Sequence, residues 1–287
     1  MLEQVMQFDN AFLHAVQAIS SQPLDLLMAG ITLFGNPVFW LLIVAFLYWQ
    51  GKEHESFHLV NLIAISSIVI GAVKNIVARP RPSANDFRVV STDNFSLDTY
   101  SFPSGHSSLI AANFFYLKNF LKKNLKIIFA IIAVLVAFSR LYLGMHYLTD
   151  VIAGLIIGSI IGWAYYRLAG KIAHSRLQLT KSGDAIAIIA ILAAAIILVG
   201  LMQSIPLSAA LIGYYLGFFS LKEIGLHGKE LSRQKFITKQ AIGFIVLLGI
   251  TAYAYSGPAF SVLWYGLAGF WISCLWPLIF DKTITHD

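Results

Sequence analysis

Long apolar runs separated by short polar segments make up most of the chain. A helix needs about 20 mostly apolar residues to cross the hydrocarbon core of a bilayer. Runs of this kind predict nine spans, at residues 24–49, 57–78, 104–121, 125–143, 148–166, 185–203, 205–221, 240–256 and 259–280. Gly35-Asn36-Pro37 falls inside the first span and is expected to bend or break it, because proline removes a backbone hydrogen bond. The pattern predicts an all-α, polytopic membrane helix bundle.

Composition strengthens the prediction of a membrane protein. Of 287 residues, 58% are hydrophobic and only 12% are charged, and the mean hydropathy is +0.74. A soluble fold of this length has too little interior to bury so much apolar surface. Disordered chains and coiled coils are excluded on the same grounds. The single cysteine, Cys274, excludes a disulfide scaffold.

The first 23 residues differ from the apolar runs that follow. They contain Glu3 and Asp9 and no lysine or arginine, so they lack the basic start of a signal peptide. Apolar residues recur at helical spacing among them, at Leu2, Val5, Met6, Phe12, Leu13, Val16 and Ile19. This pattern predicts an amphipathic helix lying in the membrane interface.

Basic residues are unevenly divided between the two sides that nine alternating spans define. One side holds fifteen of them: Lys52, Lys118, Lys122, Lys123, Lys126, Arg167, Lys171, Arg176, Lys181, Lys222, Lys229, Arg233, Lys235, Lys239 and Lys282. The other side holds five: Lys74, Arg79, Arg81, Arg88 and Arg140. The positive-inside rule assigns the larger set to the cytoplasm, with the N-terminus outside and the C-terminus inside. This distribution explains the net charge of +6 without a nucleic-acid partner.

The five outward basic residues accompany three unusually polar segments, and we interpret all five as marking a phosphate site. The segments are Lys74 to Pro82, Ser101 to His106, and Ser139 to Asp150. The loop assignment brings all three to the same face of the membrane. They are therefore expected to form one site.

The cations and the predicted helix N-terminus in these segments are expected to bind a phosphate. Burying Lys74, Arg81 and Arg140 unpaired would be costly, which implies a polyanion between them. Arginine forks match phosphate oxygens, and lysine adds a point charge. Ser104-Gly105 opens a predicted helix, where free backbone N–H groups favour an anion and glycine lets the backbone approach closely.

Two histidines could supply the reaction. His146 and Asp150 are four residues apart, so on a helix they share a face, and the carboxylate can orient the imidazole. An imidazole nitrogen held in this way can attack phosphorus and form a phosphohistidine. His106 could protonate the departing oxygen and later activate water. The cations would stabilise the transferring group without a metal.

These three segments resemble the three-part signature of the type 2 phosphatidic acid phosphatase (PAP2) superfamily. The matching patterns are Lys-x6-Arg-Pro ending at Pro82, Pro-Ser-Gly-His ending at His106, and Ser-Arg-x5-His-x3-Asp ending at Asp150. The resemblance covers about residues 24–170. It implies metal-independent hydrolysis of a phosphomonoester or pyrophosphate, without a cofactor.

The resemblance also implies a role for each matching residue. His146 would be the nucleophile, Asp150 its partner and His106 the general acid. The residues implied to bind the substrate phosphate are Lys74, Arg81, Ser104, Gly105 and Arg140. Arg79 lies just outside the signature and could touch phosphate or lipid headgroups.

Other noticeable residues receive structural interpretations. Gly154, Gly158 and Gly162 predict close helix packing that holds His146 and Asp150 against the third span. His54 and His58 have metal-ligand spacing but sit beside glutamates in a predicted cytoplasmic loop, and no metal site is expected there. In the C-terminal spans, Gln203 and the Tyr214-Tyr215 pair are candidates for substrate contact.

Three regions are expected: an interfacial helix over 1–23, a PAP2-like catalytic core over 24–170, and a three-helix C-terminal extension over 185–280. The favoured function is a lipid phosphatase in a bacterial cytoplasmic membrane, with its site at the extracytoplasmic leaflet. Its substrate would be undecaprenyl pyrophosphate, phosphatidate or phosphatidylglycerol phosphate. Alternatives are a lipid phosphotransferase, a sugar-phosphate phosphatase, and a phosphate-binding transporter or scaffold. The sequence does not fix the oligomeric state.

Overall fold

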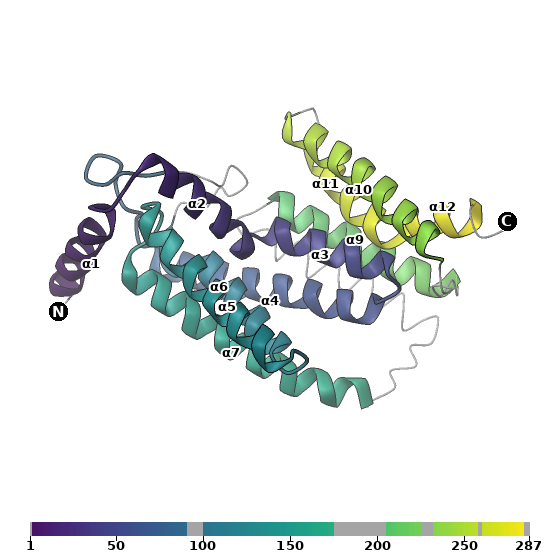
Figure 1. The fold of residues 1–287 in the computed structure, drawn as a ribbon, viewed down its shortest axis with the longest axis horizontal. Coiled ribbons are helices and arrows are strands. Elements are labelled where there is room, and N and C mark those ends of the chain that lie inside the picture. Colours follow the sequence, from purple (N-terminus) through teal and green to yellow (C-terminus); the bar gives the residue numbers. More distant parts are fainter. Residues whose placement is uncertain (1, 91–99, 175–204, 225–231, 258–259, 284–287) are drawn as a thin grey trace. The chain divides into compact units, whose positions relative to one another are not determined.

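The structure, a computed structural model, describes residues 2–90, 100–174, 205–224, 232–257 and 260–283 (Figure 1). Within those ranges every regular element is a helix, apart from an isolated bridge between Pro80 and Tyr100. The prediction of an all-α membrane protein is confirmed. The helices carry most of the apolar residues.

Five helical segments of the described chain are long and apolar enough to cross a membrane. They are α4 (Glu53–Val77), α6 (Lys123–Tyr142), Leu148–Ala169 of α7 (Leu148–His174), α10 (Arg233–Tyr255), and Ser261–Phe280, which joins α11 (Ser261–Phe270), η2 (Trp271–Leu275) and the start of α12 (Trp276–Thr283). A bent pair could add a sixth. The predicted count of nine is not confirmed.

The bent pair lies where the sequence predicts a break. Helix α2 (Gln22–Thr32) runs into a short 3-10 turn, η1 (Leu33–Gly35), and α3 (Pro37–Trp49) restarts at an angle of 55°. The Asn36 side chain accepts a hydrogen bond from the Val38 amide at 2.8 Å, which caps the new helix. The expected interruption at Gly35-Asn36-Pro37 is confirmed.

Two predicted spans form shorter helices. The third is α5 (Gly105–Leu117), with 13 residues. The seventh lies in α9 (Ile205–Ile224), of which Ile205–Leu221 is apolar. The sixth, 185–203, lies outside the described residues.

The chain divides into two compact units. The first comprises residues 1–40, 61–176 and 201–203, and the second comprises 41–60, 177–200 and 204–287. The regions predicted from the sequence divide the chain at other positions and stay a prediction. Within residues 185–280 the described chain forms α9, α10 and the segment Ser261–Phe280, and the three-helix C-terminal extension stays a prediction.

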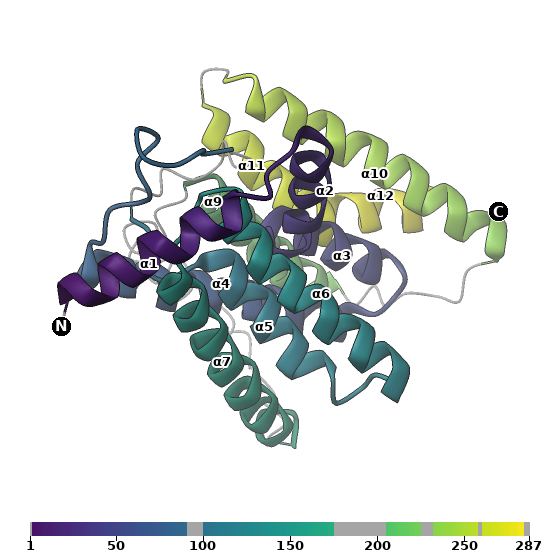
Figure 2. The same cartoon turned by 60° about the vertical axis from the view of Figure 1, so that its left-hand side comes forward.

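In the first unit, α5 packs closely along α7 (Figure 2). A Cβ atom added at Gly154, Gly158 or Gly162 of α7 would collide with a backbone carbonyl oxygen of α5 or of its N-cap residue. Those oxygens belong to Ser104, Ser108 and Ala112, in the same order along the helix. The predicted close packing of the glycine stripe is confirmed, and it holds the start of α7 against the start of α5.

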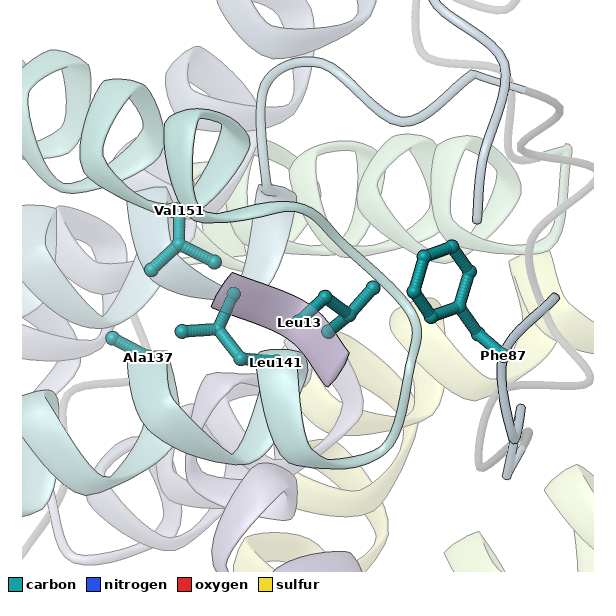
Figure 3. Packing of buried hydrophobic residues seen from close by; sticks show 5 residues of the cluster. All are labelled: Leu13, Phe87, Ala137, Leu141 and Val151. Carbon is teal, nitrogen blue, oxygen red and sulfur yellow. The ribbon is translucent and has the colours of Figure 1, made fainter. Parts of the chain in front are cut away.

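The N-terminal helix α1 (Leu2–Gln17) belongs to the same unit. Its Leu13 is fully buried against α6, α7 and the loop after α4, in a cluster with Phe87, Ala137, Leu141 and Val151 (Figure 3). The predicted helix is therefore present and docked through one apolar face. Its position in the membrane interface stays a prediction.

The second unit joins the end of α3 and the start of α4 to the C-terminal helices. The Trp49 ring nitrogen donates to the Ile272 carbonyl at 2.9 Å, and the Ser56 and Tyr214 hydroxyls are 2.9 Å apart. Tyr214 is fully buried in this contact, which gives it a packing role. Gln203, the other C-terminal candidate for substrate contact, lies outside the described residues.

Candidate active site

Three chain segments meet at one end of the first unit. They are the loop that follows α4, the start of α5, and the turn between α6 and α7. The Ser101 amide donates to the Arg79 carbonyl at 2.7 Å, and the Ser104 amide donates to the Asp150 carbonyl at 2.9 Å. The Val90 amide donates to the Leu143 carbonyl at 2.9 Å. The three polar segments of the sequence therefore lie together, as predicted.

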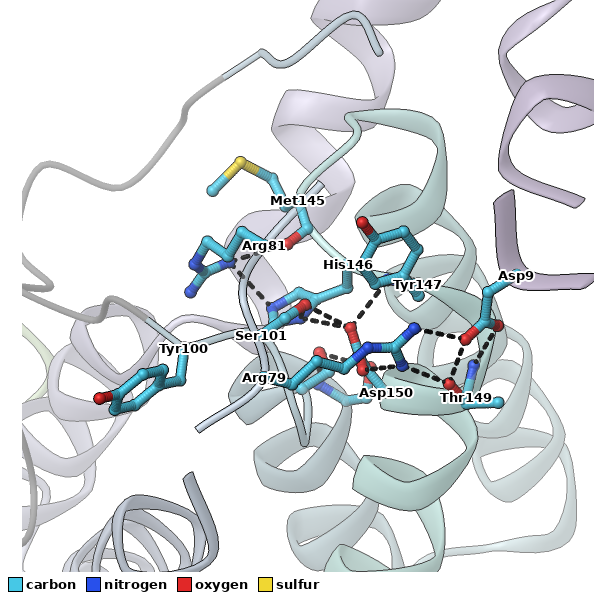
Figure 4. A network of polar contacts seen from close by, with 12 residues as sticks. Asp9, Arg79, Arg81, Tyr100, Ser101, Met145, His146, Tyr147, Thr149 and Asp150 are labelled. Carbon is cyan, nitrogen blue, oxygen red and sulfur yellow. Dashed lines mark hydrogen bonds and ion pairs between the residues drawn. The ribbon is translucent and has the colours of Figure 1, made fainter. Parts of the chain in front are cut away.

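His146 and Asp150 approach each other across the start of α7 (Figure 4). Because α7 begins at Leu148, His146 lies in the preceding turn, and the expectation that both residues share a helical face was wrong. Gly144 permits this turn with a φ of +69°, a value that disfavours other residues. The Nδ1 atom of His146 is 3.6 Å from Oδ2 of Asp150.

Ser101 stands between these two side chains. Its hydroxyl donates to Oδ2 of Asp150 and lies 3.4 Å from Nδ1 of His146. The Tyr147 amide also donates to Oδ2, at 2.8 Å. The carboxylate is therefore fixed from two sides, with one oxygen directed toward the imidazole. Sequence reasoning did not identify Ser101 as a site residue.

The opposite side of the His146 ring faces a cation. Arg81 donates to the Met145 carbonyl at 2.8 Å, and the same nitrogen lies 3.4 Å from Nε2 of His146. Burial lowers the pKa of His146 well below its ordinary value, and the charges of Arg81, Lys74, Arg140 and His106 lower it further. The ring is therefore neutral near pH 7. In the tautomer that carries its proton on Nδ1, toward the carboxylate, the lone pair is on Nε2.

The other predicted phosphate-binding cations are buried and held by oxygen atoms. Lys74 is 3% exposed and donates to the Tyr100 carbonyl at 2.5 Å. Arg140 is 1% exposed and donates to the Thr32 hydroxyl at 2.9 Å. Both charges lower the pKa of His146, so both cations lie near its ring.

The start of α5 contributes the remaining predicted residues. Ser104 caps the helix and accepts hydrogen bonds from the amide and the hydroxyl of Ser107, at 3.4 and 3.0 Å. A Cβ atom added at Gly105 would have one neighbour, a methyl group at 3.9 Å, so the backbone there is open to a ligand. His106 rests against Gly35, where an added Cβ would lie 2.9 Å from the Cβ of His106.

Arg79 and Arg88 correct one interpretation from the sequence. Arg79 donates to Asp9 at 2.7 Å and to Asp150 at 2.9 Å. Arg88 forms a bidentate ion pair with Asp25, at 2.5 and 2.7 Å, and this pairing raises its pKa. Two of the five cations in that interpretation therefore meet carboxylates of the chain itself. Of the five, Lys74, Arg81 and Arg140 remain as predicted phosphate ligands.

Comparison with known proteins identifies the family of the chain. A family model described as the PAP2 superfamily matches residues 55–173. Phosphatidylglycerophosphatase B of Bacillus subtilis is 31% identical over 171 residues, which are 55% of this chain and 81% of that protein. The chain belongs to the PAP2 superfamily. It is therefore a multi-pass membrane phosphatase.

Two further similarities show how far the PAP2 relationship extends. Lipid phosphate phosphatase delta of Arabidopsis thaliana is 26% identical over 160 residues, covering 51% of this chain and 38% of that longer protein. A crystal structure of a transmembrane PAP2 type phosphatidylglycerolphosphate phosphatase from Bacillus subtilis has a TM-score of 0.52 and 28% identity. It covers 61% of this chain and 90% of the other. The family model ends at residue 173, before the C-terminal helices.

Proposed function

We propose that this PAP2 phosphatase hydrolyses a lipid phosphomonoester or pyrophosphate through a covalent phosphohistidine at His146. The observation that carries the proposal is the two-sided setting of this ring. Its Nδ1 faces Asp150 and Ser101, while its Nε2 faces the Arg81 guanidinium. A neutral imidazole beside a cation is suited to attack a phosphate bound by that cation.

The reaction then follows in two steps. The phosphate binds between Lys74, Arg81 and Arg140 and the start of α5, where the Ser104 hydroxyl and the Gly105 amide can donate to its oxygens. Nε2 of His146 attacks phosphorus, the bond to the leaving oxygen breaks, and His106 gives that oxygen a proton.

In the second step His106 accepts a proton from water. The resulting hydroxide attacks phosphorus, the P–N bond breaks and inorganic phosphate leaves. Asp150 stabilises the imidazolium cation for as long as the phosphohistidine intermediate exists. Neither step requires a metal ion.

The charge distribution supports a site at the extracytoplasmic leaflet. The site lies at the ends of α6 and α7 that face the turn between them, while the opposite ends carry Lys122, Lys123, Lys126 and Arg167. By the positive-inside rule those opposite ends face the cytoplasm. We propose a bacterial cytoplasmic membrane, with the N-terminus outside and the C-terminus inside.

The substrate is proposed to be amphiphilic, with its phosphate at the site and its tail in the bilayer. The names of the two relatives, a phosphatidylglycerophosphatase and a lipid phosphate phosphatase, support this class. Undecaprenyl pyrophosphate, phosphatidate and phosphatidylglycerol phosphate are the three substrates to compare.

The test is phosphate release by purified protein in detergent, with EDTA present, from each of the three lipids. Activity is expected to survive EDTA, and His146→Ala should lower it at least roughly 1,000-fold because the nucleophile is lost. His54→Ala, at an exposed position on α4, is the matched control and should retain activity. Full activity in His146→Ala would refute the mechanism. Label from the substrate appearing on an acceptor lipid, and not as inorganic phosphate, would replace hydrolysis by transfer.

A further inference from the structure

Asp9 is a fully buried carboxylate on α1, far in sequence from the three polar segments. Its Oδ2 accepts hydrogen bonds from Arg79 at 2.7 Å and from the Thr149 hydroxyl at 2.5 Å. Its Oδ1 accepts from the Thr149 amide at 3.1 Å. Burying a carboxylate is costly unless it is paired in this way. Asp9 therefore docks α1 at one defined place.

That place is the first turn of α7, which carries Asp150. The amides of a first turn have no partner within their own helix, and they favour a negative charge. Asp9 supplies such a charge to Thr149, the residue that precedes Asp150 (Figure 4). A residue of α1 thus completes the end of the helix on which the partner of His146 sits.

Arg79 connects Asp9 to Asp150 directly. One guanidinium nitrogen donates to Asp9, and the other donates to Oδ1 of Asp150 at 2.9 Å and to the Thr149 hydroxyl at 2.6 Å. The guanidinium carbon also lies 4.2 Å from the centre of the Tyr147 ring, which holds the group in place. One positive charge is therefore shared between two carboxylates.

This sharing matters for the charge that His146 experiences. Oδ1 of Asp150 is directed to Arg79, and Oδ2 is directed to Ser101, Tyr147 and His146. If Asp150 were the only carboxylate beside Arg79, the pair would be neutral and would stabilise an imidazolium weakly. With Asp9 present, the group of three keeps one net negative charge beside the ring.

We propose that Asp9 and Arg79 are positioning residues, through which α1 sets the place and the effective charge of Asp150. The inference rests on the proposed function, because it concerns how His146 becomes a stabilised cation during phosphoryl transfer. Neither residue touches the phosphate. Each acts by orienting Asp150, as residues that hydrogen-bond to a ligating or catalytic side chain do in other sites.

The experiment measures kcat and KM for Asp9→Asn, Arg79→Gln and the double variant. The substrate is whichever of the three lipids the wild-type protein hydrolyses fastest, and kcat is expressed per site that forms a phosphoenzyme. Each single variant should lower kcat roughly 10-fold with KM within about twofold of wild type. The double variant should lose clearly less than the product of the two single losses, because both act through one carboxylate.

Arg79→Lys separates charge from shape. Lysine keeps the positive charge but cannot bridge two carboxylates as a planar fork. It should recover part of the kcat that Arg79→Gln loses, and it provides the test if Asp9→Asn does not fold. A kcat for Arg79→Lys no higher than that of Arg79→Gln would contradict the proposal.

The matched control is Asp25→Asn, which breaks the ion pair with Arg88 in the same unit. It should lower the unfolding temperature and leave kcat per phosphoenzyme site unchanged. If Asp9→Asn behaves like this control, its role is structural and the proposal fails. The proposal also fails if Arg79→Gln raises KM while kcat is kept, since Arg79 would then bind the phosphate.

The outcomes for this inference and for the proposed function differ. A wild-type protein that releases phosphate, an inactive His146→Ala and an unchanged Asp9→Asn would overturn the positioning role alone. A wild-type protein that releases phosphate from none of the three lipids would overturn both.

Discussion

At the scale of single residues, His146 has two neighbours of opposite charge on opposite sides of its ring. Asp150 lies on the Nδ1 side and Arg81 on the Nε2 side. The three buried or half-buried cations make a protonated ring unfavourable before substrate arrives, and a bound phosphate would offset them. Under the proposed mechanism, the neutral ring of the resting site attacks the phosphate, and the imidazolium forms only when that anion is bound.

This setting gives the first prediction. The pKa of His146 in the substrate-free protein should lie below its ordinary value of 6.5. Arg81→Gln should move it upward, because removing a positive charge removes a repulsion from the protonated ring. NMR of protein with ¹³C-labelled histidine, with the His146 signal assigned by its absence in His146→Ala, measures both values. A titration at or above 6.5 in the wild-type protein would contradict the prediction.

The same shift fixes the sign of a stability effect. As the pH falls below 6.5, the unfolded chain binds a proton at residue 146 that the folded protein binds only at lower pH. Folding stability should decrease across that interval. Above 6.5 both states have a neutral ring, and this residue contributes no pH dependence.

The residues of the three-part motif could be predicted from the sequence, but the residues that hold them in position could not. The motif residues from Lys74 to Asp150 meet as expected because each lies at or near a helix end, at the same end of the first unit. Asp9, Thr32 and Ser101 have no comparable pattern, since tertiary packing alone brings them to Arg79, Arg140 and Asp150. One signal was present: Asp9 precedes the first predicted span and Asp25 lies at its start, on the side to which the loop assignment gives Arg79 and Arg88.

At the scale of helices, the α5–α7 contact fixes the distance between the two halves of the site. It aligns Ser104, at the start of α5, with Asp150, in the first turn of α7. The small-residue stripe was sufficient to predict this contact, because close backbone approach is what glycines at four-residue spacing permit. The exact end of each helix was less predictable, since hydropathy does not register caps or turns.

The second prediction concerns this contact. A Cβ at Gly158 would collide with the backbone of Ser108, so Gly158→Ala should force α5 and α7 apart. We expect a loss of about 1–3 kcal/mol of folding stability and a lower kcat, because Asp150 moves with α7. Thermal unfolding in detergent and phosphate release measure these effects.

A matched control distinguishes the contact from a general cost of substituting glycine. At Gly249, in α10, an added Cβ would meet nothing within 4 Å. Gly249→Ala should therefore leave stability and activity near wild type. Equal unfolding temperatures for the two variants would contradict the role assigned to the α5–α7 contact.

At the scale of the whole molecule, apolar runs indicated where helices occur but not which helices pack together. The sequence suggested a core followed by an extension. In the second unit, however, Trp49 and Ser56 bond to Ile272 and Tyr214, more than 150 residues later in the chain. Such partners depend on the shapes of buried faces, which hydropathy does not contain. The C-terminal helices therefore stabilise elements that belong to the predicted core.

The last prediction concerns orientation and the role of α5 as a crossing. Its 13 residues span about 20 Å, against about 30 Å for the hydrocarbon core. Ala84 and Lys122 are both exposed and lie on either side of this helix. In a Cys274→Ser background, Ala84→Cys should react with a membrane-impermeant maleimide on intact cells, and Lys122→Cys only after permeabilisation. The reverse pattern would place the site in the cytoplasm. Reaction of both cysteines on intact cells would mean that α5 enters the membrane and returns to the same side. Every later span would then cross in the opposite direction, and the proposed position of the C-terminus would change.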